Sequence, residues 1–350
     1  MSARRALGAC LVVLGVGVGI GLGELVARAL ALEPWRVQRA PIVVEPGGSL
    51  FEPDPRLGYR HRAGRYEVRS GGHEFTVTHG PDTLRITRPD PTPTARPGLW
   101  VFGCSLTHGW LVRDEETFPW ALQQRFPRLD VVNFGVNGYG TVHGLIQLKE
   151  ALATRRSPDV VVVAYASFHE DRNTFARVRR KEIVPWNHLG PLSQPVARLD
   201  PERGFRLELA PFRYREVPGM RRLASLHLLE QAWTQLERRS LHPAEVTDAL
   251  LARFQERARE AGARFVLAGM WRDEATADRL EWARARGWLA VDVSLNLADP
   301  RNSHLPWDPH PSARGRSLYA ERLESFLARE VLSSALAMPT LPGPPIGSPQ

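Results

Sequence analysis

The sequence predicts an α/β protein, a three-layer α/β/α sandwich around a five-stranded parallel sheet. Five apolar runs rich in β-branched residues recur between residues 99 and 294, and the segments between them have helical character. The runs are continuous and do not alternate with polar residues, which indicates strands buried on both faces, as in a parallel sheet covered by helices. In chain order they are LWVFG (99–103), DVVNFG (130–135), DVVVVAYAS (159–167), RFVLAGM (264–270) and LAVDVS (289–294).

Two of the intervening segments carry clear helix signals. TFPWALQQRF (117–126) opens with a threonine and has a proline near its start, where a missing backbone N–H costs nothing. TVHGLIQLKEALATRR (141–156) places Leu145, Leu148 and Leu152 on one face, the spacing of a helix that packs against a sheet.

The N-terminal segment, residues 1–32, is predicted to be a membrane anchor. An uncharged apolar run at 6–22 follows Arg4 and Arg5, and positive charges before such a run favour a cytoplasmic N-terminus. A cleaved secretory signal is the alternative, because small-x-small patterns follow between residues 27 and 31. In both cases we expect the functional domain to lie outside the cytoplasm, in the periplasm or at the cell surface.

The rest of the chain divides into three further parts. Residues 33–98 are rich in Pro, Gly, Arg and Thr, contain short alternating stretches, and are predicted to form a β-rich lead-in without a core of its own. Residues 99–335 form the main domain, whose rhythm is interrupted by an Arg- and Pro-rich insertion at 174–243. The Pro-rich tail at 336–350 is expected to be disordered.

Composition argues against nucleic-acid binding and against a metal or other cofactor. The net charge is +8, but all of the 46 basic residues except Lys149 and Lys181 are arginines, and acidic residues are mixed among them without a basic stripe. The two cysteines, Cys10 and Cys104, are not expected to form a disulfide, because the first lies within the apolar N-terminal run. No CxxC or HxxxH spacing supports a zinc site.

Polar residues that follow the strands are the candidates for chemistry, because ligands of parallel α/β sheets bind beyond the carboxyl ends of the strands. Ser105 follows the first strand and precedes a helix whose N–H groups favour developing negative charge. A helix cap is the alternative role for this serine. His310 follows the last strand, with Asp308 two residues earlier, and such a pair supplies the base and the acceptor that a serine nucleophile requires.

Three blocks of the sequence resemble those of the SGNH/GDSL hydrolases. GCSLTHG (103–109) is similar to the GDSxxxG block, VVNFGVNGYGT (131–141) to the second block, and DPHPSARG (308–315) to the terminal DxxHP block, in the family's order. FEPDPRLGYRH (51–61) and RDEETFPWALQQRF (113–126) also resemble membrane-anchored members.

The resemblance implies a flavodoxin-like SGNH hydrolase fold and assigns roles to the matching residues. Ser105 matches the nucleophile, whose own N–H forms part of the oxyanion hole. Gly138 matches the second-block glycine, whose N–H points at the same oxygen. His310 matches the general base, and Asp308 is the predicted partner of its imidazole.

Three departures from the family pattern stand out. Cys104 replaces the Asp of the GDS block, and Asp308 precedes His310 by two residues instead of three. The third-block Asn, which completes the oxyanion hole in the family, has no counterpart at the end of the third strand. We predict that His169 fills this role, with Asn173 as the alternative, since each offers an N–H donor. The simpler interpretation is that HEDRN (169–173) is only a polar helix start.

Other side chains near the strand ends are weaker candidates. His108 follows Ser105 by three positions and is a candidate to face the pocket. Trp110, Trp271 and Trp307 lie near strand ends and are candidates to wall a substrate groove, although packing is the commoner role of tryptophan. Five further histidines show no ligand spacing and are predicted to be structural or at the surface: His143, His188, His227, His242 and His304.

These residues lead to three functional hypotheses. The first is a serine esterase that hydrolyses an O-acyl or O-acetyl ester outside the cytoplasm, with an ester-bearing small molecule, lipid or polysaccharide as substrate. The second is an O-acyltransferase that modifies a cell-envelope polysaccharide with the same residues. The third is an inactive binding protein of the same fold, which the missing third-block Asn allows.

Overall fold

A computed structural model describes residues 3–37, 41–90, 92 and 94–332, and it confirms the predicted parallel sheet. All four pairings between neighbouring strands are parallel, and the strand order is β12-β11-β8-β6-β7. Each strand lies within or across one of the predicted apolar runs. The strands are β6 (Gly98–Phe102), β7 (Asp130–Asn133), β8 (Val160–Tyr165), β11 (Arg264–Gly269) and β12 (Leu289–Asp292).

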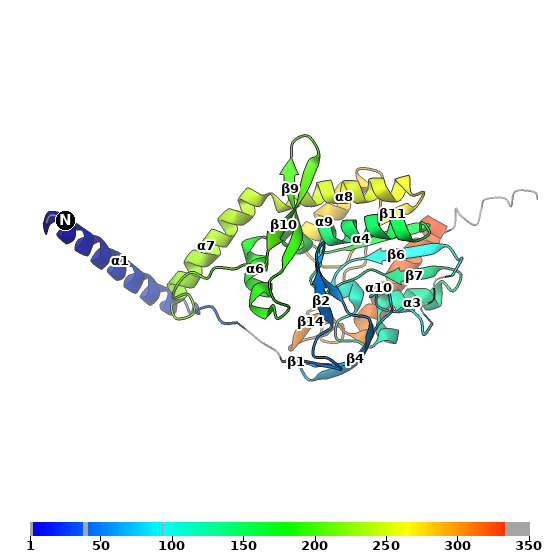
Figure 1. Cartoon of the computed structure of the whole chain (residues 1–350), viewed down its shortest axis with the longest axis horizontal. Coiled ribbons are helices and arrows are strands. Elements are labelled where there is room, and N and C mark those ends of the chain that lie inside the picture. Colours follow the sequence, from blue (N-terminus) through cyan, green and yellow to red (C-terminus); the bar gives the residue numbers. More distant parts are fainter. Residues whose placement is uncertain (1–2, 38–40, 91, 93, 333–350) are drawn as a thin grey trace, which may run out of the picture.

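Helices cover both faces of this sheet, which makes the sandwich three-layered (Figure 1). Alternate residues of β8 enter two apolar clusters: Val161 and Val163 face one, and Val160 and Val162 face the other. The first cluster includes side chains of α4 (Thr141–Thr154), α8 (Pro243–Glu260) and α9 (Glu274–Arg284). The second includes side chains of α3 (Phe118–Arg125) and α10 (Ala313–Phe326). Burial on both faces explains why the strands lack polar alternation.

The lead-in segment forms two small antiparallel sheets. One contains β1 (Ile42–Glu45), β4 (Gly64–Ser70) and β5 (His73–His79), and the other pairs β2 (Phe51–Asp54) with β3 (Gly58–His61). The apolar cluster under the first sheet also contains Trp110 and Leu111 of the main domain. The lead-in therefore packs on the loop that follows α2 (Ser105–His108). The short helix η1 (Asp114–Glu116) comes directly after this loop.

The segment 174–243 is inserted between β8 and α8. It follows the short α5 (His169–Thr174) and contains two short helices, a long hairpin and one long helix (Figure 1). These elements are α6 (Arg177–Ile183), η2 (Val184–Trp186), β9 (Ser193–Asp200), β10 (Gly204–Pro211) and α7 (Ala224–Leu241). The main domain closes with β13 (Ser303–His304), β14 (Asp308–Pro311), α10 and η3 (Leu327–Leu332).

The N-terminal helix α1 (Ala3–Ala29) extends away from the body of the protein (Figure 1). It is attached near its end, where Glu24 accepts hydrogen bonds from the backbone N–H and the hydroxyl of Ser225 at 2.9 and 3.0 Å. Within the described part of the chain, no helix combines the length and the apolarity that crossing a membrane requires. The predicted disordered tail at 336–350 lies outside the described residues.

Candidate active site

Ser105 is the first residue of α2, directly beyond the carboxyl end of β6. The residue in the cap position is Cys104, a free and buried cysteine, and no side-chain bond caps this helix. The Ser105 hydroxyl instead lies 2.8 Å from Nε2 of His310. The serine is therefore engaged with the imidazole and does not serve as a helix cap.

His310 lies on β14, and Asp308 of the same strand holds its ring. One carboxylate oxygen of Asp308 lies 2.5 Å from Nδ1 of His310 and also accepts the backbone N–H of His310 at 2.8 Å. This double contact shows how an acid only two residues before the histidine reaches its ring. Burial acts to raise the pKa of the Asp308 carboxyl, but the hydrogen bonds from the ring and the backbone N–H of His310 outweigh it, and the pKa is lowered.

The three side chains form a continuous hydrogen-bond chain across 205 positions of sequence. An ionised carboxylate can only accept, so Nδ1 of His310 carries the proton of the contact with Asp308. Nε2 then has its lone pair directed at the Ser105 hydroxyl. This is the arrangement in which an imidazole can take the proton of a hydroxyl nucleophile.

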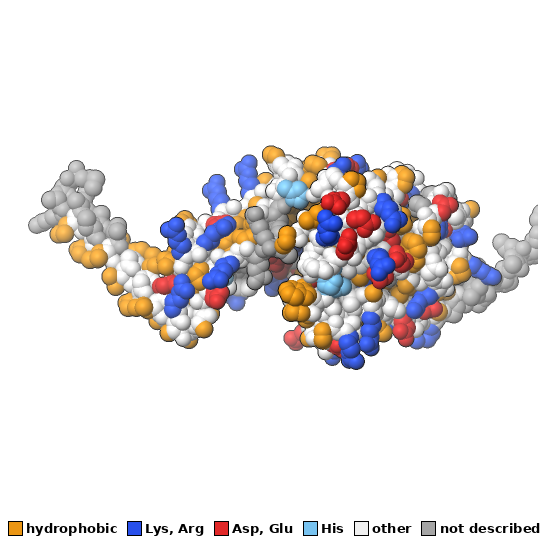
Figure 2. Space-filling view, turned by 90° about the horizontal axis from the view of Figure 1, so that it is seen from below, with side chains coloured by type: hydrophobic (Ala, Val, Ile, Leu, Met, Phe, Trp, Pro, Cys, Tyr) orange, Lys and Arg blue, Asp and Glu red, His pale blue; other side chains and the backbone are white. Residues whose placement is uncertain are grey.

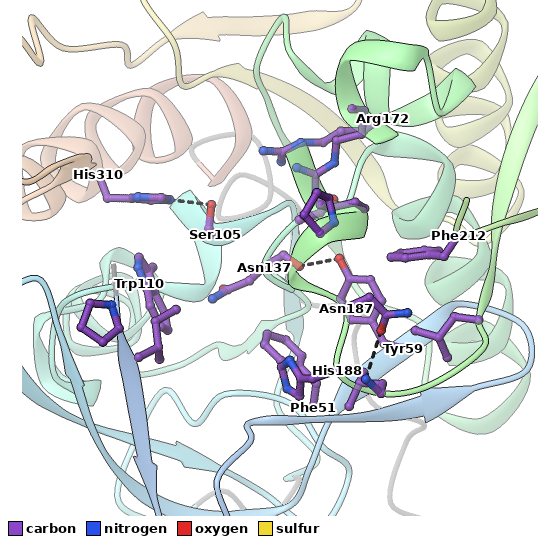
Figure 3. A pocket seen from close by; sticks show the side chains of 18 residues that line it. Phe51, Tyr59, Ser105, Trp110, Asn137, Arg172, Asn187, His188, Phe212 and His310 are labelled. Atoms are coloured by element: carbon purple, nitrogen blue, oxygen red, sulfur yellow. Dashed lines mark hydrogen bonds between the residues drawn. The ribbon is translucent and has the colours of Figure 1, made fainter. Parts of the chain in front are cut away.

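The Ser105 hydroxyl opens onto two adjoining cavities of about 1020 and 250 Å³. Both are lined by Ser105, Arg172, Arg179 and His310. Figure 3 shows the larger cavity, with Ser105, Arg172 and His310 around it. Trp110 lines the larger cavity and Trp271 the smaller one, as was anticipated for a substrate groove. Trp307 lines neither cavity, because its side chain is 74% exposed on the surface. Further walls of the larger cavity come from the lead-in and the insertion, namely Phe51, Tyr59, Leu192 and Phe212.

Gly138 lies in the wall of the larger cavity in a conformation that excludes other residues. Its φ is +86°, and a Cβ atom would lie 2.4 Å from the Tyr59 hydroxyl oxygen and 2.7 Å from Nη2 of Arg179. Within the described chain, neither the backbone N–H of Gly138 nor that of Ser105 has an acceptor. Both N–H groups are therefore available to a ligand.

His169 and Asn173 do not line either cavity, so the structure does not bring them to Ser105. The Asn173 amide is used inside the protein: its Oδ1 accepts from the N–H of Val142 at 3.0 Å, and its Nδ2 donates to Thr247 at 2.8 Å. His169 is fully buried, with its ring against those of Tyr165 and Phe168. The reason is that α5 turns both side chains toward the interior.

Two residues that sequence reasoning missed occupy the cavity instead. Arg172 lies on the same helix as His169, and its guanidinium extends toward Ser105 and His310 (Figure 3). Asn137, directly before Gly138, lines the larger cavity, and its Oδ1 has no hydrogen-bond partner in the described structure. The sequence signals were their positions, inside HEDRN and inside the second block.

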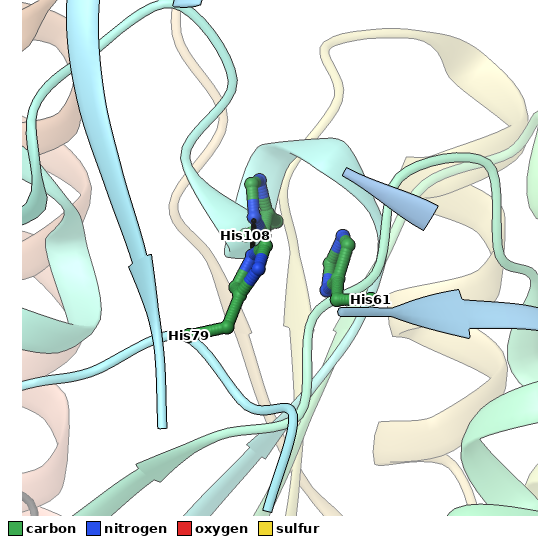
Figure 4. Close-up of side chains that lie close together, drawn as sticks. All are labelled: His61, His79 and His108. Carbon is green, nitrogen blue, oxygen red and sulfur yellow. Dashed lines mark hydrogen bonds between the residues drawn. The ribbon is translucent and has the colours of Figure 1, made fainter. Parts of the chain in front are cut away.

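His108 faces away from the cavity and joins a buried cluster with His61 and His79 (Figure 4). Nε2 of His79 lies 3.0 Å from Nε2 of His108, Nδ1 of His79 donates to the Arg62 carbonyl at 3.0 Å, and the rings of His61 and His79 stack at 4.2 Å. The three rings offer nitrogen atoms within 4.8 Å of one another, as a metal site would.

The three rings of this cluster are neutral. Burial, and then the charge of Arg85, lower the pKa of His79 to about 3, and burial is also the main cause that lowers the pKa values of His61 and His108 well below the usual value. The positive charges of Arg85 and Arg316 both act on His108. We therefore interpret the cluster as three neutral rings that pack on one another and against α2.

Arg316 connects the two loops that carry the reacting groups. It is completely buried on α10, six positions after His310, and donates to the carbonyls of Leu106 and Trp110 at 2.6 and 2.7 Å. Burial, followed by the charge of Arg85, lowers the pKa of Arg316 to about 9. The guanidinium thus remains charged at neutral pH and connects α10 to α2 and the loop that follows it.

Comparison with known proteins gives likenesses of fold at low identity. No family model matches the chain, and no curated protein matches it. Among solved structures, a protein from Desulfitobacterium hafniense assigned to the lipolytic G-D-S-L family is 14% identical with a TM-score of 0.39, covering 66% of this chain and 100% of that one.

Two further solved structures give likenesses of the same order. A lipolytic G-D-S-L family member from Veillonella parvula is 11% identical with a TM-score of 0.38, covering 66% of this chain and 98% of that one. The SGNH-hydrolase family esterase AlinE4 is 18% identical with a TM-score of 0.34, covering 71% of this chain and all of that one.

Replacing Arg316 with methionine is expected to slow the reaction of Ser105 with a fluorophosphonate probe by about tenfold to a hundredfold. The reason is that two buried carbonyls lose their donor and the Ser105–His310 distance is no longer held, and a displacement of 1 Å is enough for such a loss. Labelling rates measured by mass spectrometry test this. Arg314→Met, an exposed neighbour on α10, is the control. Equal rates for both variants would contradict the connecting role of Arg316.

Replacing His61 with phenylalanine is expected to reduce the acid sensitivity of folding. The folded-state pKa values of the buried histidines are depressed, so the unfolded chain binds more protons below pH 6.5 and stability is lost as the pH falls. Removing one such group should flatten the slope of the unfolding free energy between pH 6 and 5 by about 1 kcal/mol per pH unit. Denaturant titrations at several pH values measure it, with His73→Phe on β5 as control. If the slope of the unfolding free energy against pH is unchanged in the His61 variant, His61 is not held neutral in the folded protein.

Proposed function

We propose that this protein is a serine ester hydrolase of the SGNH/GDSL type that acts on an O-acyl or O-acetyl ester. The observation that carries the proposal is the hydrogen-bond chain from Asp308 through His310 to the Ser105 hydroxyl. The proposal is also supported by the position of these three residues at the carboxyl edge of the parallel sheet, where α/β enzymes bind their ligands. The open cavity above Ser105 supplies the room for a substrate.

The reaction follows from the positions of the proton donors and acceptors. The Ser105 oxygen attacks the ester carbonyl while Nε2 of His310 takes the hydroxyl proton, and the carbonyl oxygen becomes an oxyanion. His310 then gives the proton to the leaving alcohol as the ester C–O bond breaks. Water attacks the acyl-enzyme with His310 again as base, which releases the acid and restores Ser105. Asp308 stabilises the imidazolium in both steps.

The oxyanion requires donors, and the free N–H groups of Ser105 and Gly138 are assigned to it. We assign the third donor to the Asn137 side-chain amide, in place of His169 or Asn173. Asn137 lines the same cavity as Ser105, and within the described chain its side-chain amide makes no hydrogen bond, so its N–H donors remain unused. An amide that is free to turn toward a developing negative charge is the chemistry that the third block supplies in the family.

We propose further that α1 holds the protein at a membrane and that the catalytic domain lies outside the cytoplasm. The support is the exposure of apolar side chains along α1, which form the orange surface of this helix in Figure 2. Exposed aliphatic surface of this extent is unfavourable in water and favourable in lipid. These side chains are Leu7, Leu11, Val12, Leu14, Val16, Val18, Leu22, Leu25 and Val26, each at least 55% exposed.

Ser105→Ala and His310→Ala are each expected to reduce hydrolysis of 4-nitrophenyl acetate by about a thousandfold or more, because each removes one partner of the proton transfer. Asp308→Asn should reduce the hydrolysis rate less than either alanine variant, since the imidazole remains in place. Absorbance of released nitrophenol measures the rates, and circular dichroism checks folding. Activity that survives in a folded Ser105→Ala variant sinks the assignment.

Asn137→Ala is expected to lower kcat for the same ester by about a hundredfold with a small change in KM, because an oxyanion donor acts mainly in the transition state. Asn173→Ala and His169→Phe serve as comparison variants and should act through stability. A kcat equal to that of the wild type in Asn137→Ala would leave the two backbone N–H groups as the whole oxyanion hole.

Replacing Leu14 and Val18 together with arginine is expected to move the protein from the membrane fraction to the soluble fraction, because charged side chains are costly in the hydrocarbon layer. Fractionation with a high-salt wash measures the distribution. The control is the pair Leu207→Arg and Leu209→Arg on β10, which is exposed and apolar but lies on the hairpin. Soluble wild-type protein would refute the attachment.

A further inference from the structure

Two arginines stand in the walls of both cavities that meet at Ser105. Arg172 comes from α5 and Arg179 from α6, and the two cavities have only these arginines and the Ser105–His310 pair in common. In Figure 3 the Arg172 side chain reaches from α5 toward the space in front of Ser105 and His310. Any substrate that occupies this space therefore lies beside guanidinium groups.

The contacts of Arg172 leave its charge uncompensated. Its Nη1 donates to the Tyr139 carbonyl at 3.0 Å, and its guanidinium lies 4.3 Å from the ring centre of Phe168. No carboxylate forms an ion pair with Arg172 in the parts of the chain that the structure describes. The adjacent acid, Asp171, is instead paired with Arg238 at 2.8 Å. These contacts position the guanidinium but leave donors free.

Arg179 adds a second positive charge that is only weakly balanced. Its side chain is 10% exposed, its Nη2 donates to the Gly138 carbonyl at 3.0 Å, and Nη1 contacts Glu182 at 3.3 Å. Burial lowers the pKa of Arg179, and the charge of Arg172 is the next cause, which shows that the two guanidiniums repel each other. Glu182 is 59% exposed, so solvent screens its charge. The larger cavity, whose described lining includes both arginines and no acidic residue, therefore carries net positive charge, whereas Asp171 and Glu182 also line the smaller cavity.

We propose that the substrate ester carries an anionic group, a carboxylate or a phosphate, which Arg172 and Arg179 hold while the scissile carbonyl lies at Ser105. This proposal rests on the function proposed above and names its substrate class. Guanidinium groups bind carboxylates and phosphates through paired, charge-assisted hydrogen bonds, and an anion here would also relieve the repulsion between the arginines. The remainder of the substrate contacts an apolar wall that includes Phe51, Trp110 and Phe212.

A different role for the same residues has a different kinetic signature. If Arg172 acted on the oxyanion, its loss would slow neutral and anionic esters by the same factor, because every ester forms that oxyanion. If it binds a substrate anion, its loss changes the ratio of the two rates. The preference ratio, kcat/KM of an anionic ester divided by that of its neutral analogue, separates the two roles.

The test uses two matched pairs of esters. 4-Nitrophenyl hemisuccinate and its methyl ester place the charge on the acyl side, and 4-acetoxybenzoate and 4-acetoxybenzamide place it on the alcohol side. We expect the full-length wild type to prefer the anionic member of at least one pair by about tenfold or more. Arg172→Gln should lower this ratio by about tenfold, and 0.5 M salt should lower it in the wild type. Arg180→Gln, on α6 and bonded to Glu237, is the control that keeps the ratio.

The possible results separate a failure of the anion site from a failure of the proposed hydrolase function. Ser105-dependent hydrolysis of the neutral esters with a ratio near one in both pairs, or an equal loss for both members in Arg172→Gln, overturns the anion site and leaves the hydrolase intact. Binding of succinate and of phenyl phosphate to the folded Ser105→Ala protein, measured by calorimetry, supplies a readout without turnover. Arg172→Gln should weaken at least one of them about tenfold, and absence of binding for both also overturns the anion site.

Discussion

The hydrogen bonds of Arg316 to the Leu106 and Trp110 carbonyls are the interaction on which the candidate site depends. Ser105 and His310 belong to opposite ends of the main domain, and the parallel sheet alone only brings their loops to the same edge. A contact of 2.8 Å between two side chains requires a finer constraint. Arg316 supplies it, because it is fully buried on α10 and holds the backbone of the nucleophile loop from the side of the histidine. Burying a guanidinium is costly, so its carbonyl partners are essential to the fold around it.

The lead-in and the insertion both hold the loop that carries Gly138. The Tyr59 hydroxyl donates to the Asn137 carbonyl at 2.9 Å, and the Tyr139 hydroxyl donates back to the Tyr59 carbonyl. These bonds attach the β2–β3 hairpin to the loop that carries Gly138. From the other side, Arg179 donates to the Gly138 carbonyl. The loop that carries Gly138, the proposed second oxyanion donor, is thus held between two segments that lie outside the sheet.

The sequence predicts the parts of this structure that depend on local pattern, and it fails where long-range packing decides. Each apolar run specifies a buried strand by itself, and Ser105 and His310 stand in blocks whose spacing is recognisable. Whether a side chain of α5 points inward or outward depends on how that short helix sits on α4 and α8, so His169 was expected at the cavity where the structure has Arg172. His108 was misplaced for a similar reason, because its direction is set by contacts with His61 and His79 of the lead-in.

The attachment of α1 has a mechanical consequence. Glu24 binds α7 through Ser225, and α7 carries Glu230, which pairs with Lys181 and Arg177 of α6 at 2.5 and 3.2 Å. This relay of polar contacts ends on the same helix as Arg179. If α1 resides in a bilayer, the segment that holds the protein there is connected through these contacts to a helix that lines the cavities at Ser105. The cavity would then be held at a constant height and tilt relative to the lipid headgroups, so that distance from the membrane, as well as chemistry, would select which molecules reach Ser105.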